Sequence, residues 1–177
     1  MMISNPEETE HDEWTPVSAL GLTGYALTAL VILWLAHDGQ RWVFFLDGAN
    51  LVFHEAGHPL LGMLVPNLAV YGGTLGQLVF PVAAAITFFR QGATLSVAFA
   101  VLWIGENLFN IARYMADART QILPLVGGGK HDWTEIFSRW GMLGSDTTIA
   151  GFVRLFGWIL IVGAGFWLWR RHARKLV

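Results

Sequence analysis

Five consecutive residues combine two histidines and a glutamate at a spacing that can hold a metal ion: His54, Glu55, Ala56, Gly57 and His58. In an α-helix, residues i and i+4 lie on one face, so both imidazoles can point at the same ion. Glu55 lies about 100° round the helix from His54, and its carboxylate can reach a water molecule beside that ion. A metal lowers the pKa of such a water toward about 7, and the carboxylate can then take its proton. The pattern predicts a zinc-dependent hydrolase with His54 and His58 as metal ligands and Glu55 as the catalytic base.

The motif lies inside an apolar stretch, residues 42–65, that is long enough to cross a membrane. Ionisable residues are costly in such a segment and usually mark a functional site. One bound metal ion would account for all three ionisable residues of the motif. The alternative is a hydrogen-bonded polar cluster that packs helices together. A di-iron oxidase is disfavoured, because its site needs an E-x-x-H motif on a second helix and no other apolar stretch carries one.

Over residues 42–132 the chain resembles the intramembrane zinc metalloproteases of the site-2 protease type. The resemblance rests on the motif at 54–58 in an apolar helix, followed by the Gly-rich stretch 71–76 and a further span. It implies that His54 and His58 bind zinc and that Glu55 is the general base. In that family the third ligand is an aspartate of a Leu-Asp-Gly motif in a later span. Here the only Leu-Asp-Gly precedes the zinc motif, and its Asp47 lies about 10.5 Å from His54 along the helix, too far to bind the same ion.

A tetrahedral zinc held by two histidines needs at least one more protein ligand. The chain has no cysteine, and position 64, where some soluble enzymes have a third histidine, is leucine. We predict that His131 is this ligand. The glycines at 127–129 precede it and would let the backbone turn sharply back into a polar cavity between helices.

Two acidic residues are alternative third ligands. Glu106 lies twelve residues into the apolar stretch 94–115, the same depth that His54 has in its own stretch, and Asp117 follows the end of 94–115. We expect Asp132, beside the predicted ligand His131, and Asn110 to orient the ligands or the substrate without binding the ion themselves.

The composition places this chemistry in a membrane. Of 177 residues, 54% are hydrophobic and only 14% are charged, where a soluble globular chain usually has about 25% charged residues. This balance argues against a soluble enzyme and against a disordered chain. The formal net charge of −2 gives no reason to expect nucleic-acid binding, and the absence of cysteine excludes disulfide frameworks and thiol chemistry.

The apolar stretches predict an all-α, polytopic membrane helix bundle with about five transmembrane helices. The stretches are 17–36, 42–65, 75–89, 94–115 and 149–169, and the short one at 75–89 is either a span or a re-entrant segment. We predict a single membrane-embedded domain over 15–171, flanked by an acidic disordered tail at 1–14 and a basic tail at 172–177.

Residues 116–148 form the one long polar connection between these stretches. Within it, Trp133, Ile136, Phe137 and Trp140 recur at spacings of three and four. This pattern predicts a short amphipathic helix that lies on the membrane surface or covers a cavity.

Taken together, the sequence predicts a membrane-embedded zinc metalloprotease that hydrolyses a peptide bond in a membrane-spanning or membrane-proximal protein or peptide. The alternative is a non-enzymatic metal-binding membrane protein or scaffold. The basic cluster that follows the last apolar stretch predicts an integral protein of the plasma (inner) membrane with a cytoplasmic C-terminus. Its partners would be the lipid bilayer and the substrate, with no nucleic acid.

Overall fold

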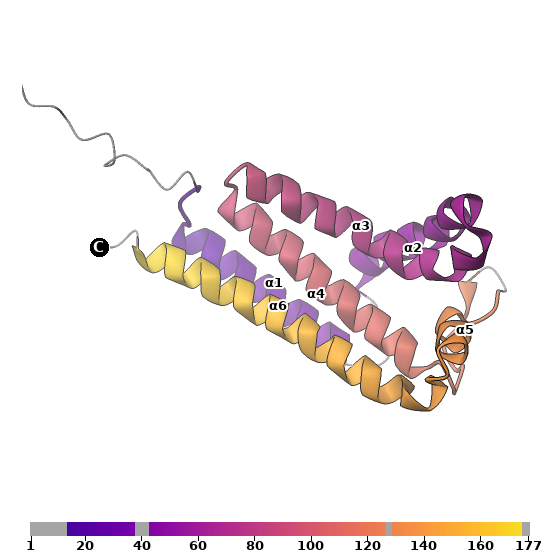
Figure 1. The fold of residues 1–177 in the computed structure, drawn as a ribbon. Helices are drawn as coiled ribbons and strands as arrows, with labels where there is room; N and C mark the ends of the chain where they lie inside the picture. Colours follow the sequence, from indigo (N-terminus) through magenta and orange to yellow (C-terminus); the bar gives the residue numbers. More distant parts are fainter. Residues whose placement is uncertain (1–13, 38–42, 127–128, 175–177) are drawn as a thin grey trace, which may run out of the picture.

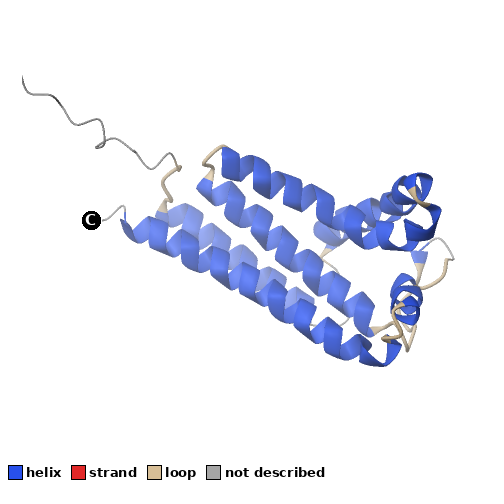
Figure 2. Cartoon of the chain, in the orientation of Figure 1, coloured by secondary structure: helices blue, strands red, loops and turns tan. Residues whose placement is uncertain are grey.

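The computed structural model describes residues 14–37, 43–126 and 129–174. These residues form α-helices and no β-strand, as the all-α prediction requires (Figure 1, Figure 2). The helices are α1 (Ala19–His37), α2 (Phe44–Leu64), α3 (Ala69–Arg90), α4 (Thr94–Ala116), α5 (Asp132–Arg139) and α6 (Asp146–Arg174). Short 3-10 turns, Pro66–Leu68 and Leu143–Ser145, precede α3 and α6.

Helix α4 is at the centre of the bundle, and α1, α3 and α6 pack against it (Figure 1). Its buried face contributes Ala98, Leu102 and Phe109 to the main apolar core, which α1 and α6 complete. Backbones approach closely where α4 meets α6, since a Cβ on Gly157 would lie 2.9 Å from the carbonyl oxygen of Gly105. Small residues allow such approaches between membrane helices, where dispersion contacts drive packing.

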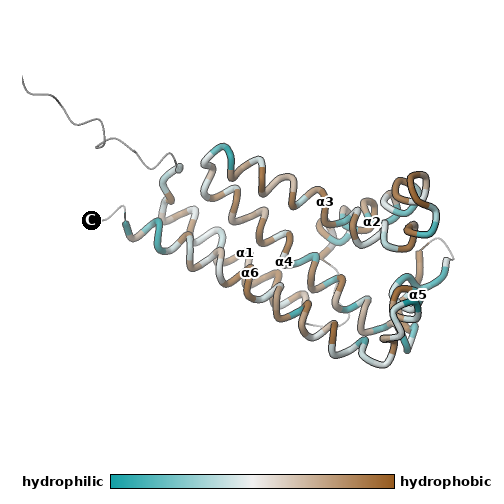
Figure 3. The backbone as a smooth tube through the Cα atoms, in the orientation of Figure 1, coloured by the Kyte–Doolittle hydropathy of each residue, from teal (hydrophilic) through white to brown (hydrophobic). Residues whose placement is uncertain are grey.

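Four helices of the described residues are long and apolar enough to cross a membrane: Ala19–His37, Pro66–Arg90, Thr94–Ala116 and Leu143–Arg174. Large apolar side chains cover their outward faces, including Leu20, Val79 and Phe152, all more than half exposed. Figure 3 shows the hydrophobic residues running along the bundle helices and the hydrophilic ones gathering at its ends and around α5. An outer surface this apolar suits lipid and identifies an integral membrane protein.

The number of candidate spans differs from the prediction of about five. Residues 75–89 are not re-entrant, because they belong to the continuous 22-residue helix α3, which begins at Ala69. The motif-bearing stretch forms α2 but is not among the four candidate spans. Its polar residues lower its hydropathy, and it lies at one end of the bundle against α3 (Figure 1).

With four spans, the start of α1 and the end of α6 lie at the same end of the bundle (Figure 1). Two contacts close this end: Thr15 N donates to Gly92 O at 2.8 Å, and His172 Nδ1 donates to Val17 O at 2.9 Å. The predicted tails, 1–14 and 172–177, lie mostly outside the described residues. Trp14 packs edge-on against Trp167, and α6 continues to Arg174, whereas residues 1–13 and 175–177 lie outside the described part.

The amphipathic helix predicted in the polar connection is α5. It buries Trp133, Ile136 and Phe137 against α3 and α4 and exposes Ser138 and Arg139. Arg139 Nη1 donates to Asn67 O at 2.5 Å, which ties the far end of α5 to the turn before α3. Helix α5 therefore covers the end of the bundle where α2 lies.

Candidate metal centre

Helix α2 carries His54 and His58 on the face that packs against α3. The two backbones touch at this crossing, since a Cβ on Gly57 would lie 1.9 Å from the carbonyl oxygen of Gly72. Glycine is therefore required at both positions. The close approach brings the two imidazoles of α2 directly over the first turns of α3.

The Nδ1 atoms of both histidines have acceptor partners on α3. His54 Nδ1 donates to Gln77 Oε1 at 3.1 Å, and His58 Nδ1 donates to the carbonyl oxygen of Ala69 at 2.9 Å. A neutral imidazole that donates from Nδ1 has its lone pair on Nε2. In this neutral form both Nε2 atoms are available as ligands, and their rings are oriented by the hydrogen bonds usual for metal-binding histidines. The hydrogen bond with Asp132 raises the pKa of His58 to about 9, so an ion that binds its Nε2 must displace a proton.

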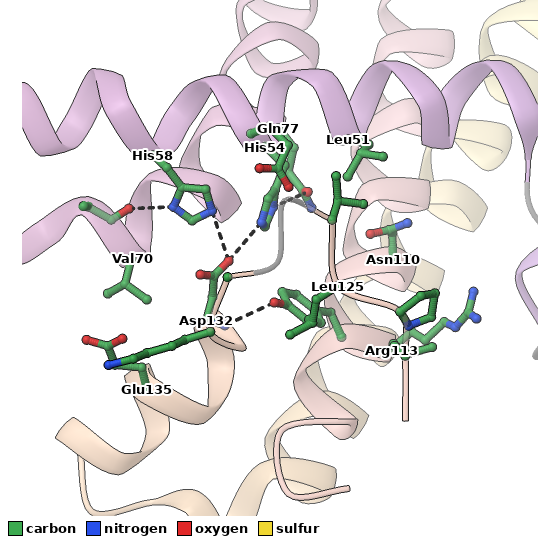
Figure 4. A pocket seen from close by; sticks show the side chains of 18 of the residues that line it. Leu51, His54, His58, Val70, Gln77, Asn110, Arg113, Leu125, Asp132 and Glu135 are labelled. Carbon is green, nitrogen blue, oxygen red and sulfur yellow. Dashed lines mark hydrogen bonds and ion pairs between the residues drawn. The ribbon is translucent and has the colours of Figure 1, made fainter. Parts of the chain in front are cut away.

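Asp132, the first residue of α5, completes the group. Its Oδ2 lies 2.9 Å from His54 Nε2 and 3.2 Å from His58 Nε2, and Figure 4 shows the two imidazoles pointing from α2 toward this carboxylate. Among the described residues, these three form the one group of His, Asp or Glu side chains whose ligand atoms all lie within 4.8 Å of one another.

Three features of this group fit a divalent metal ion. Ligand atoms about 2.0 Å from a tetrahedral zinc lie about 3.3 Å apart, close to the spacing between the Asp132 oxygen and the imidazole nitrogens. Two imidazoles and one carboxylate form a donor set common in catalytic zinc sites. The third feature is space: a Cβ on Gly73 would lie 2.5 Å from His54 Nε2 and 2.7 Å from His58 Nε2. Glycine at this position keeps the region between the nitrogens open.

The charge on Asp132 is also favourable for holding a cation. Burial acts to raise the pKa of its carboxyl group, but Nε2–H groups of His54 and His58 that donate to it in the metal-free protein outweigh burial and hold that pKa below its usual range; a bound cation would take the place of these protons. Asp132 is therefore ionised at neutral pH.

A cavity of about 610 Å³ opens beside the three residues. Glu55 lines it and is exposed, one residue along α2 from His54. Apolar side chains from three elements form much of the remaining wall, including Leu51, Val70 and Leu125 (Figure 4). The cavity is large enough for a short stretch of extended peptide, and Glu55 faces the same space as the two histidines.

His131, which the sequence predicts as the third ligand, is not part of this group. Its Nδ1 accepts a hydrogen bond from Thr134 N at 3.3 Å and so caps α5. Its Nε2 lies 3.5 Å from Asp117 Oδ2. Burial lowers the pKa of His131, so the ring is neutral. The structure thus places Asp132, expected to be an orienting group, where His131 was expected.

The two alternative ligands also lie elsewhere. Glu106 Oε2 accepts a hydrogen bond from Asn50 Nδ2 at 2.7 Å, in a buried polar contact between α2 and α4. Asn110 lines the cavity and donates to Asp47 Oδ1 at 2.8 Å, which again links α4 to α2. These contacts hold the start of α2 against α4. Asp117 follows α4, where it accepts hydrogen bonds from the backbone of the next loop.

Two contributors to the site were not foreseen. Gln77 orients His54, and its presence in an otherwise apolar stretch is a signal that could have pointed to it, because buried amides in spans usually have a polar partner. Gly73 belongs to the Gly-rich stretch 71–76, but periodicity alone does not tell which glycine faces the histidines.

Comparison of the chain with protein-family models, with curated proteins and with solved structures finds no match in any of the three.

Proposed function

We propose that this protein is a membrane-embedded zinc metallopeptidase that cleaves a peptide bond in a membrane-spanning or membrane-proximal substrate. The proposal depends on one observation: Asp132 converges with His54 and His58, while Glu55 lines the adjoining cavity. A purely structural polar cluster would not need an open, glycine-lined space between its nitrogens, nor an exposed glutamate next to it.

Each residue has a role in this reaction. His54, His58 and Asp132 would hold the ion, with Gln77 and the Ala69 carbonyl fixing the orientation of the two rings. When bound, zinc would supply a Lewis acid that lowers the pKa of water and polarises the scissile carbonyl. Glu55 would accept the proton of the attacking water and pass it to the leaving amine, as expected of a carboxylate within reach of a reacting water.

The place of the site in the bundle supports a substrate within or next to the membrane. Gly73 is four residues from the start of α3, about 6 Å along its axis, and Tyr114, which contacts Asp132, lies in the last turn of α4. The site is therefore close to the bundle end that α5 covers. A peptide bond near that membrane face would reach the cavity without crossing the whole bilayer.

The test is Glu55→Gln, compared with wild type in detergent or liposomes. We expect the variant to keep about one zinc per chain and to cleave a model transmembrane substrate at least about 100-fold more slowly, the usual scale for a lost general base. Elemental analysis measures the metal, and gel analysis of the cleaved substrate measures turnover. Near-normal cleavage by the variant would exclude this mechanism. A wild-type protein that binds zinc but cleaves no peptide would instead favour a non-enzymatic metal-binding role.

For the orientation, we propose that the C-terminus lies on the cytoplasmic side of a plasma membrane. Arg90 ends α3, and Arg170, Arg171 and Arg174 end α6, at the same end of the bundle (Figure 1). Basic residues next to spans favour the cytoplasmic side. The candidate metal centre would then open toward the opposite side of the membrane.

A further inference from the structure

His131 is completely buried, yet the proposed metal site does not use it. Its side chain is 0% exposed, and the ring lies against that of Tyr114, with centroids 4.2 Å apart. A buried polar ring needs hydrogen-bond partners to offset its desolvation. Among the described residues, only the Nδ1 atom of the His131 ring makes a hydrogen bond, whereas the buried Nε2 has no hydrogen-bond partner and approaches a single carboxylate. These two contacts indicate the role of the ring.

The two ring nitrogens contact two different elements. Nδ1 accepts from Thr134 N, so in the neutral ring the proton is on Nε2, which faces Asp117 Oδ2 at 3.5 Å. The ring thus joins the first turn of α5 to the end of α4. Because His131 directly precedes Asp132, anything that holds His131 also restrains the carboxylate that meets His54.

Asp117 contacts the start of the polar connection, the segment that follows α4. Its Oδ1 accepts from Ile122 N at 2.9 Å, and its Oδ2 accepts from Leu123 N at 3.0 Å. These hydrogen bonds lower the pKa of Asp117 against the opposing effect of burial, so it is a carboxylate. The Asp117 side chain therefore contacts both the segment that leaves α4 and His131, the residue that precedes α5.

Tyr114 adds a third restraint, since its hydroxyl accepts a hydrogen bond from Asp132 N at 3.1 Å. The backbone of Asp132 is thereby fixed from α4 as well.

We propose that His131 is a positioning residue: through its cap on α5 and its contact with Asp117 it holds Asp132 where the carboxylate meets His54 and His58. This inference rests on the proposed metal site. It also accounts for a buried histidine next to the ligand group without making it a ligand. Removing the His131 ring would leave all three ligand side chains present but release the one contributed by α5.

The experiment uses the full-length protein loaded with Co²⁺, whose visible spectrum and shifted proton resonances report its ligands. In wild type, we expect two solvent-exchangeable imidazole N–H resonances, from His54 and His58 Nδ1. In His131→Ala, we expect the same two resonances, a changed visible band and a Co²⁺ affinity about 10–100-fold lower, the scale for a lost supporting group. His131→Asn can restore the helix cap but lacks the ring, so its Co²⁺ affinity should lie between those of wild type and His131→Ala.

Ser138→Ala is the matched control, because it alters an exposed side chain on the same short helix and should keep the wild-type band and affinity. Three imidazole resonances in wild type would make His131 a ligand and overturn the proposal. A His131→Ala variant with the Co²⁺ affinity and visible spectrum of wild type would also overturn the proposal. If the alanine variant does not fold, the same result in His131→Asn would overturn it. Wild-type protein that binds no Co²⁺ would instead contradict the proposed metal site itself.

Discussion

A single methyl group at position 73 should abolish metal binding. In Gly73→Ala the added Cβ would lie 2.5 Å and 2.7 Å from the two Nε2 atoms, within the space that the ion needs. We expect zinc content below about 0.1 per chain, because the metal cannot approach both nitrogens at a bond length of about 2.0 Å. Gly163→Ala on α6 is the control, since its Cβ meets nothing within 4 Å. Equal zinc content in the two variants would show that the ion binds elsewhere.

Substitutions of the acidic residues should separate the true third ligand from its alternatives. Asp132→Ala removes the oxygen that contacts both histidines, so we expect zinc affinity to fall by more than about 100-fold, beyond the range for an orienting group. Glu106→Gln should keep the metal, because Glu106 hydrogen-bonds Asn50 away from the group. Competition with a fluorescent zinc chelator measures both affinities. The reverse pattern would identify Glu106 as the ligand.

The crossing of α2 and α3 is the element-scale feature on which the site depends. Gly57→Ala would place a Cβ 1.9 Å from the Gly72 carbonyl oxygen, so the helices must separate. We expect this overpacking to destabilise the protein by about 1–3 kcal/mol and to weaken zinc binding, because the imidazoles move with α2. Gly48→Ala on the same helix has free space around its Cβ and should be neutral or mildly stabilising. Thermal unfolding in detergent compares the two, and equal midpoints would contradict the tight crossing.

At the scale of the whole molecule, four spans require the start of α1 and the end of α6 to lie on one side of the membrane. The chain has no cysteine, so single cysteines can be labelled without background. We expect a membrane-impermeant maleimide to label Ser18→Cys and Arg174→Cys from the same face, and Ser138→Cys on α5 from the opposite face. If Ser18→Cys and Arg174→Cys were labelled from opposite faces, the chain would have an odd number of spans.

The same experiment in inverted vesicles tests the orientation. If the basic end is cytoplasmic, Arg174→Cys should react only when the cytoplasmic face is exposed. Reaction from the outside of intact cells would reverse the proposed orientation while leaving the four-span arrangement intact.

Local patterns in the sequence were sufficient to predict that the chain is helical and that His54 and His58 lie on one face of a helix. The spacing of His54 and His58 depends only on helix geometry, so their common face follows from the i, i+4 rule. The amphipathic helix α5 was predictable for the same reason, since its apolar residues repeat with the helical period. Long apolar stretches likewise identify an all-α membrane protein, because only helices satisfy the backbone of such segments internally.

Tertiary structure alone decided which residue meets the two histidines. His131 and Asp132 are neighbours, and no local rule says which side chain points at α2. The cap on α5 and the Asp117 contact turn His131 away, and the first helical position then directs Asp132 inward. The extent of α3 was decided in the same way, because residues 69–74 lengthen the short apolar stretch into a helix that packs against α2. Each outcome depends on contacts between segments distant in sequence, whose strength is set by packing and hydrogen bonding and not by local periodicity.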